Sequence, residues 1–200
     1  LRSQACIFLG YLASHLVAIT TRCQKKKQSS RDSEWYGGCF ARMELLLLPR
    51  LTDKSQVVRQ SAIQATGKWL GSPSPTSLVV NSNEEMEDKS TTSAPALLER
   101  LLWSMWHDPS VANRVEAIQA IPIDSAETLD HVVARIRDVK EKVRVAAIDA
   151  LHFKVDPRRR DIITEEHFCD VVRYGLTERC NATKTATTAL ICNKWMKAAK

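Results

Sequence analysis

Basic side chains gather at three places in this sequence. The first is a lysine run, Lys25, Lys26 and Lys27. The second is a cluster around an expected helix boundary, Arg135, Arg137, Lys140 and Lys142. The third is an arginine triplet, Arg158, Arg159 and Arg160. Residues 1–50 carry a net charge of +5 and residues 151–200 carry +4, in a chain whose net charge is +6. Lysine and arginine bind phosphates by releasing counterions, without reading base sequence. These residues are therefore candidate contacts to a DNA backbone.

Each group also has a structural alternative. Lys25 to Lys27 lie in a stretch without periodicity, followed by Trp35 and Tyr36, which is also typical of a solvated loop. For the cluster around the helix boundary, the alternative is ion pairing along the same helices. The acids within reach are Asp130, Glu141 and Asp149. The triplet has only Asp156 and Asp161 close by, which favours DNA contact there.

Catalytic and metal-binding patterns are missing from the sequence. It has six glycines and no phosphate-binding glycine loop, G-x-S-x-G or H-E-x-x-H motif. Its five histidines stand singly and its six cysteines form no C-x-x-C, so we expect no catalytic residue, metal or cofactor. This cysteine usage favours a reducing compartment, although Cys23 and Cys39 flank one loop and their pairing stays open. Cys6 and Cys192 fall on apolar helical faces and are expected in the core.

The helices that would position these side chains are clearest in residues 124–155. Apolar residues recur there at spacings of three and four on both sides of Asp138, which predicts two amphipathic helices in a hairpin. We expect Asp138 to cap the second helix, with Glu141 completing a capping box, and Asp124 and Glu127 to do the same for the first. Two short helices cannot hide their apolar faces alone, but a stack of hairpins can.

The hairpin recurs when four acids are aligned at the start of each second helix: Asp53, Asp108, Asp138 and Glu178. Six places on stand Arg59, Arg114, Arg144 and Lys184. Nine places on stand Ala62, Ala117, Ala147 and Thr187, and twelve places on stand Ala65, Ala120, Ala150 and Leu190. Two places before each acid stand Leu51, Trp106, Ile136 and Leu176. Arg2 fits the six-place column of a hairpin that begins before the sequence, which suggests a fragment of a longer repeat array.

This pattern resembles the HEAT repeat, best seen in LLLLPRLTDKSQVVRQSAIQATGKWL, residues 45–70. Residues 108–197, with the phrase RIRDVKEKVRVAAIDAL, resemble the N-terminal HEAT repeats of the condensin subunit 3 family, the chromosome-associated-protein G type. The arginines of the six-place column are HEAT signature residues. The resemblance implies that Arg59, Arg114 and Arg144 pair with acids of adjacent repeats and hold the stack together.

The resemblance implies an all-α fold, a HEAT-repeat α-solenoid of stacked antiparallel helical hairpins. Proteins of this family bind the kleisin subunit of condensin and, with it, double-stranded DNA without sequence preference. The ATPase belongs to the coiled-coil subunits, so this chain would be non-catalytic. The expected location is the nucleus and the chromosome, where the chain would support mitotic condensation, with the cytoplasm possible in interphase.

Two other classes stay open. A HEAT scaffold for protein partners, of the phosphatase or transport-receptor type, would share the hairpins without needing the basic ends. A HEAT-like DNA glycosylase would need a base-flipping pocket with an acid and aromatic side chains on a concave face. The tryptophans fall on expected core columns instead, including Trp103, Trp106 and Trp195.

The expected organisation follows the breaks in periodicity. Residues 1–19 form the second helix of a truncated hairpin, 20–38 a basic loop, 39–70 a HEAT repeat and 71–94 a flexible insertion, in which Ser72 and Ser74 precede prolines as kinase sites often do. HEAT repeats follow at 95–123 and 124–156, and residues 157–200 hold a basic loop and a last repeat. The apolar run from Ala5 to Ile19 is too short to span a bilayer, so no membrane partner is expected.

Overall fold

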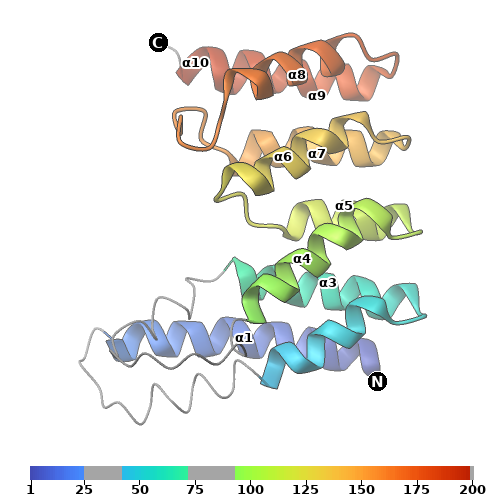
Figure 1. The fold of residues 1–200 in the computed structure, drawn as a ribbon, viewed down its shortest axis with the longest axis vertical. Coiled ribbons are helices and arrows are strands. Elements are labelled where there is room, and N and C mark those ends of the chain that lie inside the picture. Colours follow the sequence, from blue (N-terminus) through green and yellow to red (C-terminus); the bar gives the residue numbers. More distant parts are fainter. Residues whose placement is uncertain (25–41, 72–92, 199–200) are drawn as a thin grey trace, which may run out of the picture. The chain divides into compact units, whose positions relative to one another are not determined.

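The computed structural model describes residues 1–24, 42–71 and 93–198, which form helices and no strand. The elements of the first part are α1 (Arg2–Gln24), a helix over residues 42–47 that continues as the 3₁₀ turn η1 (Leu48–Thr52), α3 (Gln56–Leu70) and α4 (Ser93–His107). The second part holds α5 (Val111–Ala120), α6 (Ala126–Ala134), η3 (Arg135–Arg137), α7 (Glu141–Lys154), α8 (Glu165–Leu176), α9 (Asn181–Leu190), the π-helical turn η4 (Ile191–Trp195) and α10 (Met196–Ala198). Figure 1 shows them along the chain.

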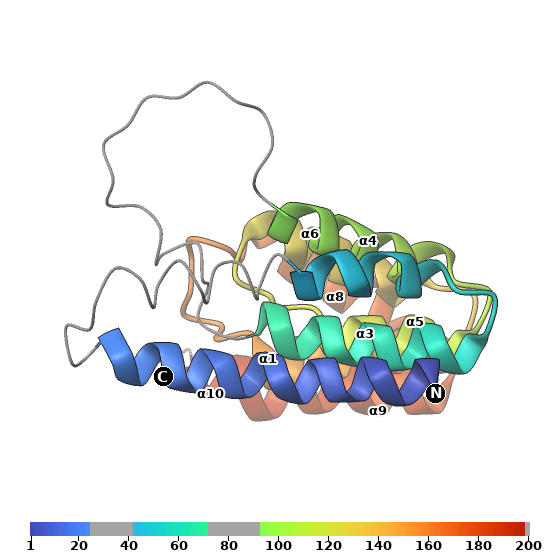
Figure 2. The ribbon, with the colours of Figure 1, turned by 90° about the horizontal axis from the view of Figure 1, so that it is seen from below.

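The chain divides into two compact units, Leu1–Ser104 and Met105–Lys200. In the first unit α1 packs along α3, as Figures 1 and 2 both show. Small residues permit this close packing, because a Cβ added to Gly10 would lie 3.0 Å from Cα of Ala65. The hydroxyls of Ser3 and Ser61 lie 2.6 Å apart along the same contact.

In the second unit the hairpins stack in order. The second helices α5, α7 and α9 form one row, and the first helices α6 and α8 pack beside them (Figure 1). Each hairpin thereby covers the apolar face of its neighbour, which two short helices alone could not do. The predicted fold class, an all-α repeat of stacked antiparallel helical hairpins, is confirmed.

The repeat columns predict the core well. The nine-place residues Ala62, Ala117, Ala147 and Thr187 are all fully buried, and most of the twelve-place column is buried too. Two places before the acids, Leu51 and Ile136 are buried, whereas Leu176 is 41% exposed. Cys6 is buried as expected.

Several expectations about single residues are wrong. Cys192 is exposed because it lies in the π-helical turn η4, where the α-helical spacing of the preceding turns is lost. Trp103 is 43% exposed, and Arg100 lies over its ring, with the guanidinium carbon 4.2 Å from the ring centroid. Helix α1 ends at Gln24, so residues 20–24 are helical rather than part of a loop.

The capping predictions also need correction. Lys140 is the N-cap of α7, while Asp138 accepts the N–H of Lys140 from outside the helix, at 2.8 Å. For α6 the cap is Ser125, which forms a capping box with Thr128, and not Asp124 with Glu127. Asp138 does accept a backbone N–H, but in a turn before the helix. Aspartate side chains accept backbone N–H groups in such turns as well as at helix N-caps.

Lys25, Lys26 and Lys27 lie outside the described residues, as do Cys39, Ser72 and Ser74. Within the described ranges no helix combines the length and apolar character needed to cross a bilayer.

Candidate nucleic-acid interface

The turns before the second helices have a common geometry. In each, the carboxylate accepts the backbone N–H two residues on: Ser55 to Asp53 at 2.9 Å, Ser110 to Asp108 at 2.8 Å and Lys140 to Asp138 at 2.8 Å. The arginine six places on donates Nη1 to the acid's own carbonyl: Arg59 to Asp53 at 2.8 Å, Arg114 to Asp108 at 2.9 Å and Arg144 to Asp138 at 2.9 Å. Each turn is therefore closed from both sides.

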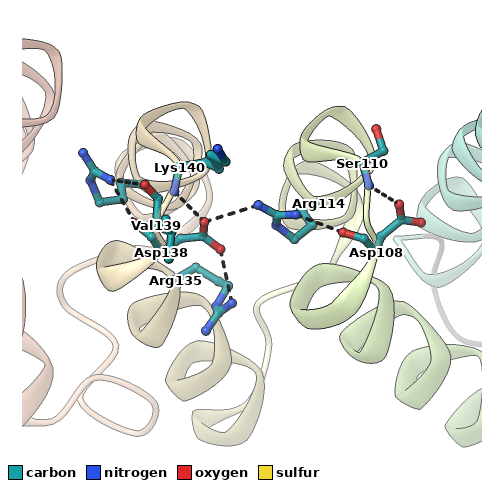
Figure 3. Close-up of polar contacts among 8 residues, drawn as sticks. Asp108, Ser110, Arg114, Arg135, Asp138, Val139 and Lys140 are labelled. Atoms are coloured by element: carbon teal, nitrogen blue, oxygen red, sulfur yellow. Dashed lines mark hydrogen bonds and ion pairs between the residues drawn. The ribbon is translucent and has the colours of Figure 1, made fainter.

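The guanidinium groups also reach the acid of a neighbouring hairpin. Arg114 Nη2 lies 3.4 Å from Oδ1 of Asp138, as Figure 3 shows. Nε of Arg144 lies 2.9 Å from Oε2 of Glu178, and in the first unit Nη1 of Arg2 lies 2.8 Å from Oδ2 of Asp53. The structural role expected of Arg114 and Arg144 is confirmed. Arg59 donates to the carbonyl of Asp53 in its own turn, and its pairing with an acid of an adjacent repeat stays a prediction.

Arg135, a predicted DNA contact, is held inside this framework. Its Nη1 lies 3.3 Å from Oδ2 of Asp138, and its guanidinium carbon lies 3.3 Å from the centroid of the Trp106 ring. Trp106 is fixed in turn, because its indole N–H donates to Nδ1 of His131 at 3.2 Å. Only 11% of the Arg135 side chain is exposed, and burial lowers its pKa. Contact with a phosphate would require this packing to open.

Arg137, Lys140 and Lys142 are in a different position. All three are exposed between the end of η3 and the first turn of α7, and none forms an ion pair with an acid of the described residues. Arg137 lies over the ring of Tyr174, 4.7 Å from its centroid, and its charge still faces solvent. Of the expected acid partners, Asp130 instead lies 2.5 Å from Nε2 of His167.

The next hairpin adds basic residues that sequence reasoning missed. Arg179 and Lys184 are exposed at the start of α9, which packs beside α7. Figure 1 shows the α6–α7 and α8–α9 turns on the same edge of this unit. Packed helices lie about 8–10 Å apart, so the two helix starts present positive charge on neighbouring hairpins of one edge. The repeat alignment placed Lys184 in the six-place column but did not show that it is exposed.

The arginine triplet lies in the connection between α7 and α8, and its members differ. Nη2 of Arg159 lies 2.5 Å from Oδ2 of Asp161. Arg158 and Arg160 instead line an open pocket with Phe168 and Trp195.

The two basic groups lie at opposite ends of α7. That helix has 14 residues, so its ends are about 21 Å apart. In Figure 1 the α7–α8 connection lies on the left and the α6–α7 turn on the right. The candidate DNA contacts at the two ends of α7 therefore form two separate groups.

Two lysines near the carboxyl ends of second helices have a structural task that the sequence analysis missed. Nζ of Lys154 donates to the carbonyl of Ile121 at 2.8 Å and to those of Ile118 and Gln119, which lie at or just beyond the end of α5. Lys194 donates in the same way to the carbonyl of His152 in α7. Burial lowers the pKa of both lysines. Both lie sixteen places after an aligned acid, but the same place holds Trp69 and Asp124 in the other two repeats, so the alignment shows no recurring residue class there.

Histidines in this unit support turns. Nδ1 of His167 accepts the N–H of Thr164 at 3.0 Å, which leaves Nε2 to donate to Asp130. Across the described ranges, no three His, Cys, Asp or Glu side chains cluster in a way that could hold a metal ion.

A comparison with protein-family models found no match to this chain, and a comparison with curated proteins found none either.

Proposed function

We propose that this chain is a non-catalytic HEAT-repeat part of a condensin subunit that binds double-stranded DNA without sequence preference. One observation carries the proposal: Arg137, Lys140 and Lys142 are exposed together and have no acid partner in the described part of the chain. Lysine and arginine so placed can approach phosphates without breaking any ion pair of the fold. The condensin assignment, with kleisin as partner and a nuclear, chromosomal location, is supported by the sequence resemblance alone.

The packing of the other arginines strengthens this reading. Arg114 and Arg144 form ion pairs between hairpins, and Arg135 is stacked on Trp106. These three arginines therefore contact the protein itself. Arg137, Lys140 and Lys142 are additional to that framework. Arg179 and Lys184 extend the charge onto the next hairpin.

Fluorescence anisotropy of a labelled duplex of arbitrary sequence, titrated at several salt concentrations, tests the proposal. The variant carries Arg137→Gln, Lys140→Gln and Lys142→Gln. If all three residues contact phosphates, the slope of log affinity against log salt falls by about 2.7. A control with Arg42→Gln, Arg173→Gln and Lys197→Gln removes the same charge from other exposed positions.

Equal losses in the two triple variants would reduce the effect to net charge and contradict a defined interface. No binding by the wild-type chain at low salt would contradict DNA contact by this segment. The absence of catalysis is tested separately: incubation with alkylated DNA should release no base, whereas release would favour a glycosylase.

A protein-binding scaffold is the second candidate. It is favoured by one observation, the pocket beside Arg158 and Arg160, whose walls include aromatic side chains.

A further inference from the structure

A pocket opens at the end of the second unit where the α7–α8 connection meets η4. It has a volume of about 380 Å³ and is lined by Pro157, Arg158, Arg160, Phe168, Trp195 and Ala198. This volume falls in the range of pockets that hold a ligand or a side chain of a partner. The residues come from three separate segments, so the pocket is a product of the tertiary fold.

Aromatic rings form one side of the pocket. Phe168 and Trp195 meet edge to face, with ring centroids 4.5 Å apart. Trp195 also lines a second, small cavity together with Leu151, Ile163 and Val171 of the hairpin core. An aromatic pair of this kind offers apolar surface on which an apolar side chain can bind.

Two arginines supply the charge. Arg158 and Arg160 are exposed, and neither forms an ion pair with an acid of the described residues. The guanidinium carbon of Arg160 lies 5.4 Å from the centroid of the Phe168 ring. Guanidinium groups bind carboxylates through paired hydrogen bonds, so an acidic group would be held beside the apolar site.

The combination distinguishes peptide from duplex DNA. A duplex presents phosphates on its outer surface, and the apolar group that it exposes in the major groove is the thymine methyl, which is too small to fill a pocket walled by Phe168 and Trp195. An acidic peptide with one large apolar side chain satisfies both features at once, because the side chain fills the pocket while its acidic neighbours meet Arg158 and Arg160.

We propose that the pocket formed by Arg158, Arg160, Phe168 and Trp195 binds an acidic peptide segment of a partner protein that carries an apolar or aromatic anchor. This site is separate from the proposed DNA contacts, since it lies at the opposite end of α7 from Lys140. The chain thus presents a basic edge for phosphates and a pocket for a protein.

The test is selection of random dodecapeptides displayed on phage against the whole 200-residue chain. The same selection is run on the Arg158→Gln, Arg160→Gln double variant and on Phe168→Ala. Arg159→Gln is the matched control, because Arg159 lies in the same loop but pairs with Asp161. Circular dichroism melting checks that each variant folds. An enriched peptide is then synthesised and its affinity measured by anisotropy.

The expected result is a consensus with Asp or Glu next to Phe, Trp or Leu. The synthetic peptide should bind at least about tenfold more weakly to the double variant, and to Phe168→Ala, than to the wild type. Arg159→Gln should change its affinity by less than about threefold. Without enrichment of such peptides, or with equal binding to all variants, the proposal is overturned. A pocket that instead contacts DNA would show loss of duplex affinity in the double variant and no acidic consensus.

Discussion

Arg114 joins two hairpins through one guanidinium group. Its Nη1 donates to the carbonyl of Asp108 at 2.9 Å, and its Nη2 lies 3.4 Å from the carboxylate of Asp138 in the following hairpin. The arginine thus closes its own turn and fixes the next one at the same time. Arg144 repeats the arrangement with Asp138 and Glu178.

Replacing Arg114 should therefore destabilise the second unit. Arg114→Ala removes a positive charge from beside the carboxylate of Asp138, whose side chain is only 7% exposed and so is poorly hydrated. We expect a loss of about 2 kcal/mol in the free energy of unfolding, measured by urea denaturation. Arg114→Lys should restore little of it, because an ammonium group cannot hold both partners in a fork.

Lys142→Ala is the control for this series, since Lys142 is exposed and has no ion pair among the described residues. Its effect should stay within about 0.5 kcal/mol. An Arg114→Ala variant as stable as Lys142→Ala would show that the inter-hairpin contact contributes nothing to stability.

Lys154 should stabilise the stack from the other end of α7. Its ammonium group caps carbonyls at the end of α5, where the helix dipole favours a cation. Lys154→Met keeps most of the apolar stem and removes the charge, so thermal unfolding followed by circular dichroism should show a loss of about 1 kcal/mol. Lys197→Met removes an exposed lysine of the same unit as the control. Equal melting temperatures for the two variants would contradict a capping role.

The contact between α8 and α9 should not tolerate a side chain at Gly175. A Cβ there would lie 2.4 Å from Oγ1 and 2.6 Å from Cγ2 of Thr187, which is fully buried. Gly175→Ala forces the helices apart, and we expect a loss of about 1–3 kcal/mol in urea unfolding. Thr187→Ala removes the two closest atoms, so the double variant should lose less than the sum of the single changes. Strict additivity would mean that the two residues do not interact in this way.

The acid and arginine columns could be predicted because the same residue class recurs at a fixed spacing. Periodicity also placed Ala117 and Ala147 in the core, where they are fully buried. Helix starts were less predictable, because an Asp before a helix can cap it or close a turn outside it. Asp138 does the latter, and nothing in its neighbours' letters distinguishes the two.

The candidate site was predicted only in part for a related reason. Arg135 and Arg137 look alike in the sequence, yet Arg135 is stacked on Trp106 and Arg137 is exposed over Tyr174. The difference depends on contacts between residues far apart in the chain, and the spacing of neighbouring residues does not predict such contacts. The same holds for the triplet, in which Arg159 pairs with Asp161 while its two neighbours face a pocket.

Glu44 in the first unit should make stability depend on pH. Its side chain is 1% exposed, its Oε1 has no hydrogen-bond partner among the described residues, and burial raises its pKa from 4.5 to about 7. Between these two values the unfolded chain loses its proton while the folded chain keeps it. The contribution of Glu44 to the free energy of unfolding should therefore be largest below pH 4.5 and fall by about 3 kcal/mol as the pH rises towards 7.

Glu44→Gln removes the titrating group, so it should be more stable than the wild type at pH 7 and should lose most of this pH dependence. Urea unfolding at a series of pH values between 4 and 8 measures both effects. Glu99→Gln, at an exposed position of α4 in the same unit, should keep the wild-type slope. If Glu44→Gln follows the wild-type profile across this range, Glu44 is ionised in the folded protein and its burial is compensated by a partner. The pH dependence would then have to come from other groups.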